Sequence, residues 1–163
     1  MTEPIICDTS IWLYTGRLGQ FELLAHLYQP VFTTETVCRE LDIGRLRQSG
    51  LLDPRELSWV EVVQPDPSDI TGLPTNRLGP GERSVLAYAR THHLPVVGLD
   101  DRQARDLAHR LGLQVIGTVG VLVKAKEAGL ITAVHPLLEQ LQQEGFYISQ
   151  ALWLYALRRT HEA

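Results

Sequence analysis

Short apolar runs that alternate with amphipathic helical segments are the feature of this sequence that most restricts its fold. Strands are expected at residues 4–7, 31–33, 59–63, 95–99 and 114–116. Helices are expected at 11–15, 21–28, 119–128, 136–144 and 150–158. Two more are expected to begin at 34 and at 79, and another follows the fourth strand and extends to 111. Residues 64–78 are expected to form a surface loop. This alternation predicts a mostly parallel sheet with helices on both faces, and functional sites beyond the carboxyl ends of the strands.

The size of the chain fits one domain. Its 163 residues suffice to bury a core without disulfides or structural metals, so we expect a single domain over 1–163. The C-terminal helices at about 133–159 are expected to pack on this domain or to form a partner surface. The first residues lack the features of a signal peptide, and no run approaches the roughly 20 apolar residues of a membrane span, which predicts a cytoplasmic protein without membrane contact.

The cysteines and the net charge exclude several classes of site. Cys7 and Cys38 stand in apolar patterns without a C-x-x-C spacing, so we interpret both as buried hydrophobic residues. A disulfide or thiolate metal site is the alternative. The net charge of −4 argues against a protein that binds long nucleic acid mainly through a high net positive charge. It is compatible with a nuclease, because clustered carboxylates lower the total charge and bound cations reverse it locally.

Acidic residues follow two of the expected strands. Asp8 ends the first strand, and Asp100 with Asp101 ends the fourth, so all three are expected at the same edge of a parallel sheet. The alternative is simple helix capping, for which aspartate is well suited. It applies above all to Asp100, because Gln103 three residues later completes a capping-box pattern.

Two glutamates lie on helix faces that are expected to meet the core. Glu82 precedes Val85 and Leu86 at spacings of three and four, and Glu40 follows Val37 by three. An inward glutamate is costly unless it is paired or binds a cation. The alternative for each is a partly solvated or ion-paired side chain.

Together these residues predict a cation site. Carboxylates from four chain segments that meet at one rim repel one another and raise one another's pKa, and a divalent cation removes the conflict. Oxygen ligands without histidine or cysteine favour Mg²⁺ or Mn²⁺ over zinc. The candidate acids are Asp8, Glu40, Glu82, Asp100 and Asp101.

An ordered set of motifs extends from residue 5 to about residue 157. It consists of Asp8-Thr9-Ser10, Val37-x-x-Glu40-Leu41, Gly79-x-Gly81-Glu82, Leu99-Asp100-Asp101-x-x-Ala104-Arg105, a glycine-rich stretch at 112–122, and Gly145-Phe146-x-Ile148-Ser149. In this order and spacing the sequence resembles PIN-domain ribonucleases, in particular a prokaryotic PIN-like subfamily related to VapC-type toxins. The resemblance implies an α/β/α sandwich with a central five-stranded parallel sheet. It also implies endonucleolytic cleavage of RNA with Mg²⁺ or Mn²⁺.

The resemblance also implies roles for individual residues. The catalytic acids would be Asp8, Glu40, Glu82, Asp101 and Asp100, and the metal ligands would be Asp8, Glu82, Asp101 and Asp100. Of the neighbouring pair we favour Asp101 as the ligand and Asp100 as the helix cap. Ser10 and Thr118 match polar positions near the family's site, where hydroxyls hold water.

The predicted reaction is hydrolysis of an RNA phosphodiester by a water that a cation activates. Arg102 and Arg105, just past the acidic edge, are candidates for contacts with RNA phosphates. The alternative is that both are helix-surface arginines or partners of the neighbouring aspartates.

Two other functions are weighed against a ribonuclease. A PIN-like binding or scaffold module would use its acids only for caps and salt bridges. Another Mg²⁺-dependent phosphotransferase is disfavoured, because the chain lacks a D-x-D after the first strand and a Walker-type loop.

The possible protein partners follow from the resemblance and from the end of the chain. The resemblance to VapC-type toxins suggests the toxin of a toxin–antitoxin pair, which a small protein antitoxin would hold inactive. Residues 151–157 are unusually apolar for a terminal helix. They are expected to pack on their own domain, or to form a homodimer or partner surface.

Overall fold

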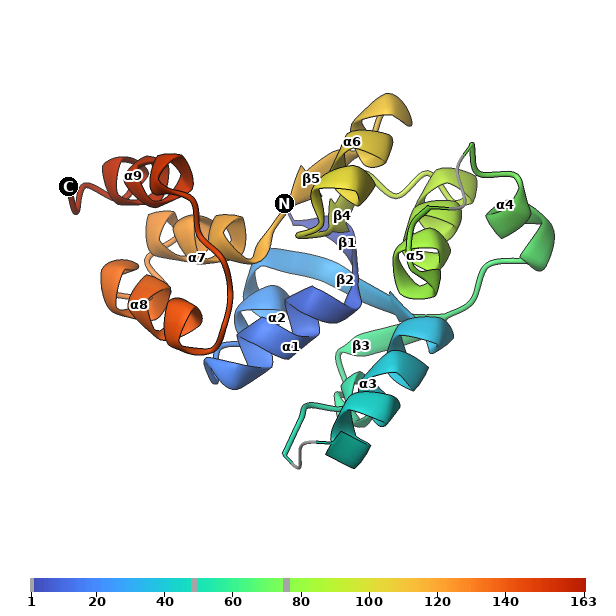
Figure 1. Cartoon of the computed structure of the whole chain (residues 1–163), viewed down its shortest axis with the longest axis horizontal. Coiled ribbons are helices and arrows are strands. Elements are labelled where there is room, and N and C mark those ends of the chain that lie inside the picture. Colours follow the sequence, from blue (N-terminus) through green and yellow to red (C-terminus); the bar gives the residue numbers. More distant parts are fainter. Residues whose placement is uncertain (1, 48–49, 75–76) are drawn as a thin grey trace.

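A single parallel sheet organises the chain, and Figure 1 shows its strands surrounded by helices. The computed structural model describes residues 2–47, 50–74 and 77–163. In this part of the chain the strand order is β3-β2-β1-β4-β5, and all four strand pairings are parallel. The strands are β1 (Glu3–Cys7), β2 (Tyr28–Thr34), β3 (Val60–Val63), β4 (Val96–Gly98) and β5 (Gln114–Ile116). The predicted α/β/α fold with five parallel strands is confirmed.

The chain winds the sheet in two directions from its centre. It runs from β1 outward to β3, and then returns to the other side of β1 for β4 and β5. Because such crossovers are right-handed, the helices that lead into β4 and β5 lie on the face opposite to α1 and α2, whereas α7, which follows β5, contacts both α1 and α2. In Figure 1, α1 and α2 lie below the strands and α6 lies above them. The helices are α1 (Thr9–Arg17), α2 (Leu23–Leu27), α3 (Glu35–Arg47), α4 (Pro67–Thr71), α5 (Pro80–Thr91), α6 (Arg102–Arg110), α7 (Thr118–Glu127), α8 (His135–Gln143) and α9 (Gln150–Arg159).

One expected loop contains a helix. Residues 64–78 were predicted to be irregular, but α4 occupies Pro67–Thr71. The prolines of this segment suggested a break, whereas Pro67 stands in the first turn, where its missing N–H costs no hydrogen bond. A helix of five residues is also too short to show a helical period. Thr75 and Asn76, which fall in the same predicted loop, lie outside the described residues.

The central strand is buried on both faces, as its continuous apolar sequence predicts. Ile5 and Ile6 have no exposed surface, and the indole of Trp12 on α1 is equally buried. The indole N–H donates to the Thr33 hydroxyl at 3.1 Å, and this hydroxyl donates to the Cys7 carbonyl at 2.8 Å. These bonds join α1, β2 and β1 just below the site edge. Both cysteines are buried and free, as expected.

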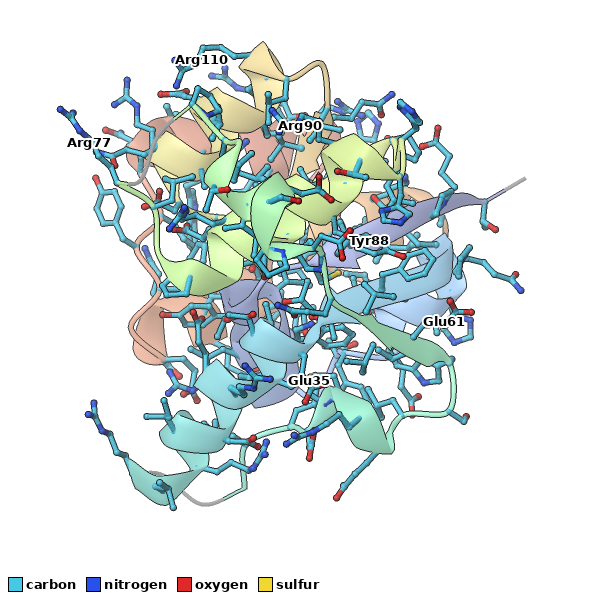
Figure 2. All side chains as sticks on the ribbon, turned by 90° about the vertical axis from the view of Figure 1, so that its right-hand side faces the viewer. Glu35, Glu61, Arg77, Tyr88, Arg90 and Arg110 are labelled. Carbon is cyan, nitrogen blue, oxygen red and sulfur yellow. The ribbon has the colours of Figure 1, made fainter. Side chains whose placement is uncertain are left out.

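The helix α5 covers the sheet on the side shown in Figure 2. Its buried Val85 and Leu86 belong to the core, and Tyr88 lies against Phe32 of β2 with ring centroids 6.1 Å apart. Glu61 on β3 is exposed in the same view. The packing of α5 across the sheet fixes the position of its first turn, which lies at the site edge.

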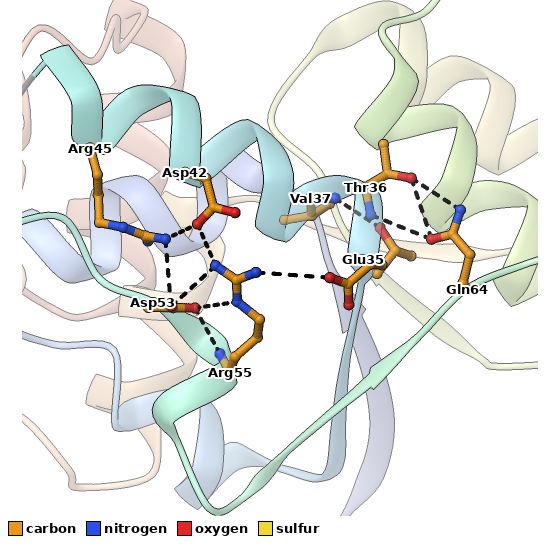
Figure 3. Close-up of polar contacts among 9 residues, drawn as sticks. Glu35, Thr36, Val37, Asp42, Arg45, Asp53, Arg55 and Gln64 are labelled. Atoms are coloured by element: carbon orange, nitrogen blue, oxygen red, sulfur yellow. Dashed lines mark hydrogen bonds and ion pairs between the residues drawn. The ribbon is translucent and has the colours of Figure 1, made fainter.

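A network of charged side chains ties α3 to the segment before β3 (Figure 3). Arg55 bonds to Asp53 at 3.0 Å and lies 3.8 Å from Glu35. Both Arg45 and Arg55 also contact Asp42. Ion pairs of this exposure contribute little individually, but the network holds α3 from two turns. It thereby positions the middle of α3, which carries Glu40.

The C-terminal helices pack partly on the rest of the chain. In α9, Ala156 and Leu157 are buried, whereas Leu154 and Tyr155 keep 37% and 48% of their surface exposed. Part of the apolar segment 151–157 therefore packs into the core of the domain, and another part forms an apolar face that is exposed to solvent. Among the described helices, none has both the length and the apolar composition needed to cross a membrane.

Candidate active site

The point at which the sheet reverses carries the first acids of the site. Residues Cys7 and Gly98 are paired at the carboxyl ends of the adjacent strands β1 and β4. Asp8 follows directly, and its backbone N–H donates to the Gly98 carbonyl at 3.0 Å. Asp100 comes two residues after β4. The prediction that Asp8 and Asp100 reach one edge of the sheet is confirmed, and this edge is the switch point where open α/β sheets bind their ligands.

Asp8 is a buried carboxylate without a hydrogen-bonding partner on one oxygen. Its residue is 6% exposed, and within the described residues Oδ1 has no donor. Burial is the main cause that raises the pKa of Asp8, to about 8; the backbone N–H of Thr9 opposes this shift, and the charges of Glu82, Glu40 and Asp100 add to it. The hydroxyl of Ser10, in the first turn of α1, is also buried and unpaired in this part of the structure. The site thus contains polar atoms that lack a partner among the described residues.

Glu40 joins three helices rather than pointing freely into the site. Its Oε2 accepts from the Thr9 hydroxyl at 2.6 Å, and its Oε1 accepts from the Gly81 backbone N–H at 2.8 Å. A Cβ atom on Gly81 would lie 2.7 Å from the Glu40 carboxylate, so a larger residue fits there only if this carboxylate moves away from its hydrogen-bonding partners. The predicted inward direction of Glu40 is explained by this bonding, since an inward carboxylate needs partners.

Glu82 lies in the first turn of α5 and faces two other acids. Its Oε1 accepts from the backbone N–H of Gly79 at 3.2 Å, which satisfies a donor at the helix start. Its pKa is raised, first by partial burial and then by the charges of Asp101 and Glu40, against a lowering by the Gly79 N–H. Glu82 therefore takes part in the same electrostatic cluster as Asp8.

Of the two aspartates after β4, Asp101 rather than the predicted Asp100 caps the following helix. Asp101, which is exposed, is the N-cap of α6 and accepts from the Ala104 N–H at 3.0 Å. Asp100 instead accepts from the backbone N–H and the hydroxyl of Thr118, each at 2.7 Å. The prediction that Asp100 is the cap is wrong, because α6 begins one residue later than the capping-box pattern suggested. Asp100 is consequently free to bind the start of α7.

Helix starts converge on this edge and offset part of its negative charge. Backbone N–H groups at the starts of α5, α6 and α7 donate to four of the five acids, and the positive ends of helix dipoles favour carboxylates. Sequence reasoning missed Gly117, where a Cβ would lie 2.8 Å from Asp100 Oδ1. The Gly117-Thr118 pair at the end of a strand was the signal for it. Among the described acids of the site, Asp8 differs in having a buried oxygen without a hydrogen-bonding partner.

The residues fit a hard cation in their chemistry, although they are not assembled around one. Within the described ranges, no three Asp, Glu, His or Cys side chains form a group that could hold a metal ion. The candidate donors are nevertheless all oxygen atoms, and the Asp8 oxygen without a described partner is buried among like charges. The ionised form of such a buried carboxyl group is stable only beside a positive charge, and a bound divalent cation would supply this charge.

The two candidate arginines differ in position. Arg102 is exposed at the start of α6. Arg105, one turn on, is partly buried, and its Nη1 lies 3.5 Å from the point where a Cβ on Gly117 would stand. Neither guanidinium forms an ion pair with a described residue, so partnership with the neighbouring aspartates does not explain them.

Comparison with known families decides the identity of this fold. A model of the PIN-domain family matches residues 4–162, almost the whole chain. The chain belongs to the PIN-domain family. PIN domains are in general nucleases that use divalent metal ions, and the acidic switch point is where such chemistry is expected in this PIN domain. A search of curated proteins gave no match to the sequence.

Proposed function

We propose that this PIN domain is a Mg²⁺- or Mn²⁺-dependent endoribonuclease that hydrolyses RNA phosphodiester bonds. The observation that carries the proposal is the buried Asp8 carboxylate, whose Oδ1 has no donor among the described residues and which lies within the field of Glu82, Glu40 and Asp100. A negative site of this kind would repel RNA phosphates. A bound cation would offset both the repulsion among the carboxylates and the repulsion between the carboxylates and the substrate.

The roles of the acids follow from their hydrogen bonds. Asp8 and Glu82 are the principal candidates to hold the cation, together with Asp100, whose charge acts on Asp8, and Asp101, whose charge acts on Glu82. A bound Mg²⁺ or Mn²⁺ would lower the pKa of a water molecule and offset charge on the phosphate. Glu40 is a positioning residue, because both of its oxygens are engaged by Thr9 and Gly81.

Neutral and positive groups complete the proposed site. The Ser10 hydroxyl, which has no partner in the described structure, is a candidate to hold water beside Asp8. Thr118 holds Asp100 through two hydrogen bonds. Arg102 and Arg105 would contact RNA phosphates, because a guanidinium group binds phosphate oxygens through charge-assisted hydrogen bonds.

A cleavage assay tests this proposal. A mixed RNA pool is incubated with Mn²⁺, and the cut sites of the wild type are compared with those of Asp8→Asn. Asp106→Asn is the matched control, because Asp106 is an exposed aspartate of α6. We expect loss of cleavage in Asp8→Asn alone, with both variants folded by circular dichroism. Undiminished cleavage by the Asp8 variant refutes the proposal.

The second candidate function is a catalytically inactive scaffold. It is favoured by the observation that four of the five acids already accept hydrogen bonds from backbone N–H groups at the starts of α5, α6 and α7. A scaffold of this kind needs no cation. Its melting temperature should not respond to Mg²⁺ or Mn²⁺, whereas a ligand that binds only the folded state raises it.

We also propose that the ribonuclease is the toxin of a toxin–antitoxin pair and acts in the cytoplasm. The support is the sequence resemblance to VapC-type toxins. The exposed Leu154 and Tyr155 of α9 are a candidate surface for a small protein antitoxin or a homodimer. Induced expression should arrest growth with the wild type and not with Asp8→Asn; equal growth would contradict the toxin role.

A further inference from the structure

A groove lies beside the edge strand β5 and opens at the proposed active site. It has a volume of about 560 Å³ and is bounded by β5, α7, α9 and the segment before α9. This volume falls within the range of roughly 300–1,000 Å³ that encloses small ligands, so it accommodates one or two nucleotides. Residues that matter for its chemistry are Asp100, Arg105, Lys124, Tyr147, Tyr155 and Arg159.

The groove is continuous with the acidic edge. Asp100 and Gly117 line both the groove and the site described above. Arg105 stands at this boundary, with Nη1 3.5 Å from the position of a Cβ on Gly117. A phosphate bound by Arg105 would therefore lie next to the acids, at the point where a substrate strand passes from the groove to the scissile bond.

Tyr147 presents an aromatic ring to solvent at the groove. It is 84% exposed, yet its two neighbours in the chain are anchored in the core. Phe146 packs edge-on against Tyr14 at 4.8 Å, and Ile148 is buried. The backbone is thus held on both sides of Tyr147 while its ring buries little surface. An exposed ring on a fixed support provides a stacking surface for a base.

Tyr155 is a second ring, and it is held in place. Its hydroxyl accepts from Arg159 Nη1 at 3.0 Å, and Arg159 Nη2 binds both carboxylate oxygens of Glu127 at 3.0 Å. Nearby, Lys124 donates to the hydroxyl of Tyr28 at 3.2 Å and forms no ion pair with a described carboxylate. The groove therefore offers two aromatic faces together with the positive charges of Lys124 and Arg105, which no described acid pairs with. Of the carboxylates in its lining, Glu127 is paired with Arg159 and Asp100 accepts hydrogen bonds from Thr118, while Glu3 lies at the start of β1.

We infer that this groove binds the single-stranded RNA segment next to the cleaved bond, with bases on Tyr147 and Tyr155 and phosphates on Arg105 and Lys124. The inference rests on the proposed ribonuclease function and adds the place on the molecule where the substrate strand lies. Base faces are available for stacking only in unpaired strands, because a duplex stacks them on one another. The combination of exposed aromatic rings with these two cations favours a polynucleotide over a peptide as the occupant.

Binding measurements on a cleavage-deficient background test the inference separately from catalysis. The full chain carrying Asp8→Asn is titrated into a fluorescently labelled single-stranded RNA hexamer, and anisotropy gives the affinity. Tyr147→Ala should weaken binding about tenfold or more, as expected for loss of one base stack. Tyr147→Phe keeps the ring and should bind normally. Leu46→Ala is the control, because Leu46 is 88% exposed on α3.

The outcomes distinguish the groove from the proposed function. If the protein with Asp8 intact cleaves RNA but Tyr147→Ala changes neither affinity nor KM, the groove assignment is wrong while the ribonuclease function stands. If nothing is cleaved but Tyr147→Ala still weakens RNA binding, the groove is an RNA site and the catalytic proposal fails. Equal or tighter binding of a duplex of the same sequence, or no RNA binding at all, overturns the inference.

Discussion

Replacing Asp8 by asparagine should stabilise the metal-free protein at neutral pH while it removes activity. The pKa of Asp8 is raised from 3.8 to about 8 by burial and by the neighbouring acids. A group whose pKa is raised on folding contributes stability below its unfolded pKa and loses it as the pH rises. Asp8 therefore destabilises the fold progressively between pH 3.8 and about 8, because in this range it ionises in the unfolded chain but keeps its proton in the folded protein.

The size of the effect follows from the same shift. Between the unfolded pKa and pH 7 the difference is about three pH units, and each unit is about 1.36 kcal/mol, which gives roughly 4 kcal/mol as the cost of keeping Asp8 protonated in the folded protein while the unfolded chain is ionised. Asparagine does not ionise and so avoids this cost, but its buried amide would leave donors unpaired at a cost of about 1–3 kcal/mol. We expect a net gain of about 2 kcal/mol at pH 7, or about 5 °C in melting temperature for a chain of this size.

The sign of the effect should reverse in acid. Near pH 4 the wild-type Asp8 is protonated in the folded protein, and the two proteins then differ only in the unpaired amide that asparagine introduces. The Asp8→Asn variant should therefore be less stable than the wild type at pH 4, with the curves crossing near about pH 5 to 6. Urea unfolding in excess chelator across this range measures the difference. Asp106→Asn should stay within about 0.5 kcal/mol throughout; an Asp8 variant that is less stable at pH 7 refutes the reasoning.

Two further predictions concern contacts around the site and at the end of the chain. Gly81→Ala should lower the free energy of unfolding by about 2 kcal/mol, because its Cβ would overlap the Glu40 carboxylate. In the double variant, Glu40→Ala should recover part of this loss. Urea unfolding of the wild type, both single variants and the double variant measures the coupling. Burial acts to raise the pKa of Glu162, but the N–H groups of Val134 and His135 donate to this carboxylate and bring its pKa down to about 2. The lowered pKa stabilises the fold above about pH 4.5, and this stabilisation is lost as the pH falls toward 2. The free energy of unfolding of Glu162→Gln should therefore be about 1 kcal/mol lower at pH 7, and its stability should fall less steeply in acid.

Local patterns were sufficient to predict the sheet and the edge that bears the site. The apolar runs that end at Cys7 and Leu99 are buried on both faces, so their sequence predicts central parallel strands. The acids after them must then meet, because parallel strands end at the same edge. Gly112 also has the positive φ of 78° expected of a residue that ends a helix.

The partners of the acids could not be predicted in the same way. Glu40 binds Thr9 and Gly81, which are 31 and 41 residues away, and Asp100 binds Thr118 across 18 residues. These bonds depend on how helices pack on the sheet, which local spacing does not encode. The wrong prediction of which aspartate caps α6 has the same origin, since either residue satisfies a capping rule and only the packing of α7 selects one.

The central claim is that carboxylates from separate strands and helices form a cation site around the buried Asp8. Calorimetric titration of the chelator-treated protein with Mn²⁺ tests it without reference to any substrate. We expect the wild type and Asp106→Asn to bind Mn²⁺ with the same affinity, and Asp8→Asn to bind at least about tenfold more weakly. No binding to the wild type, or equal binding to the Asp8 variant, would contradict the account.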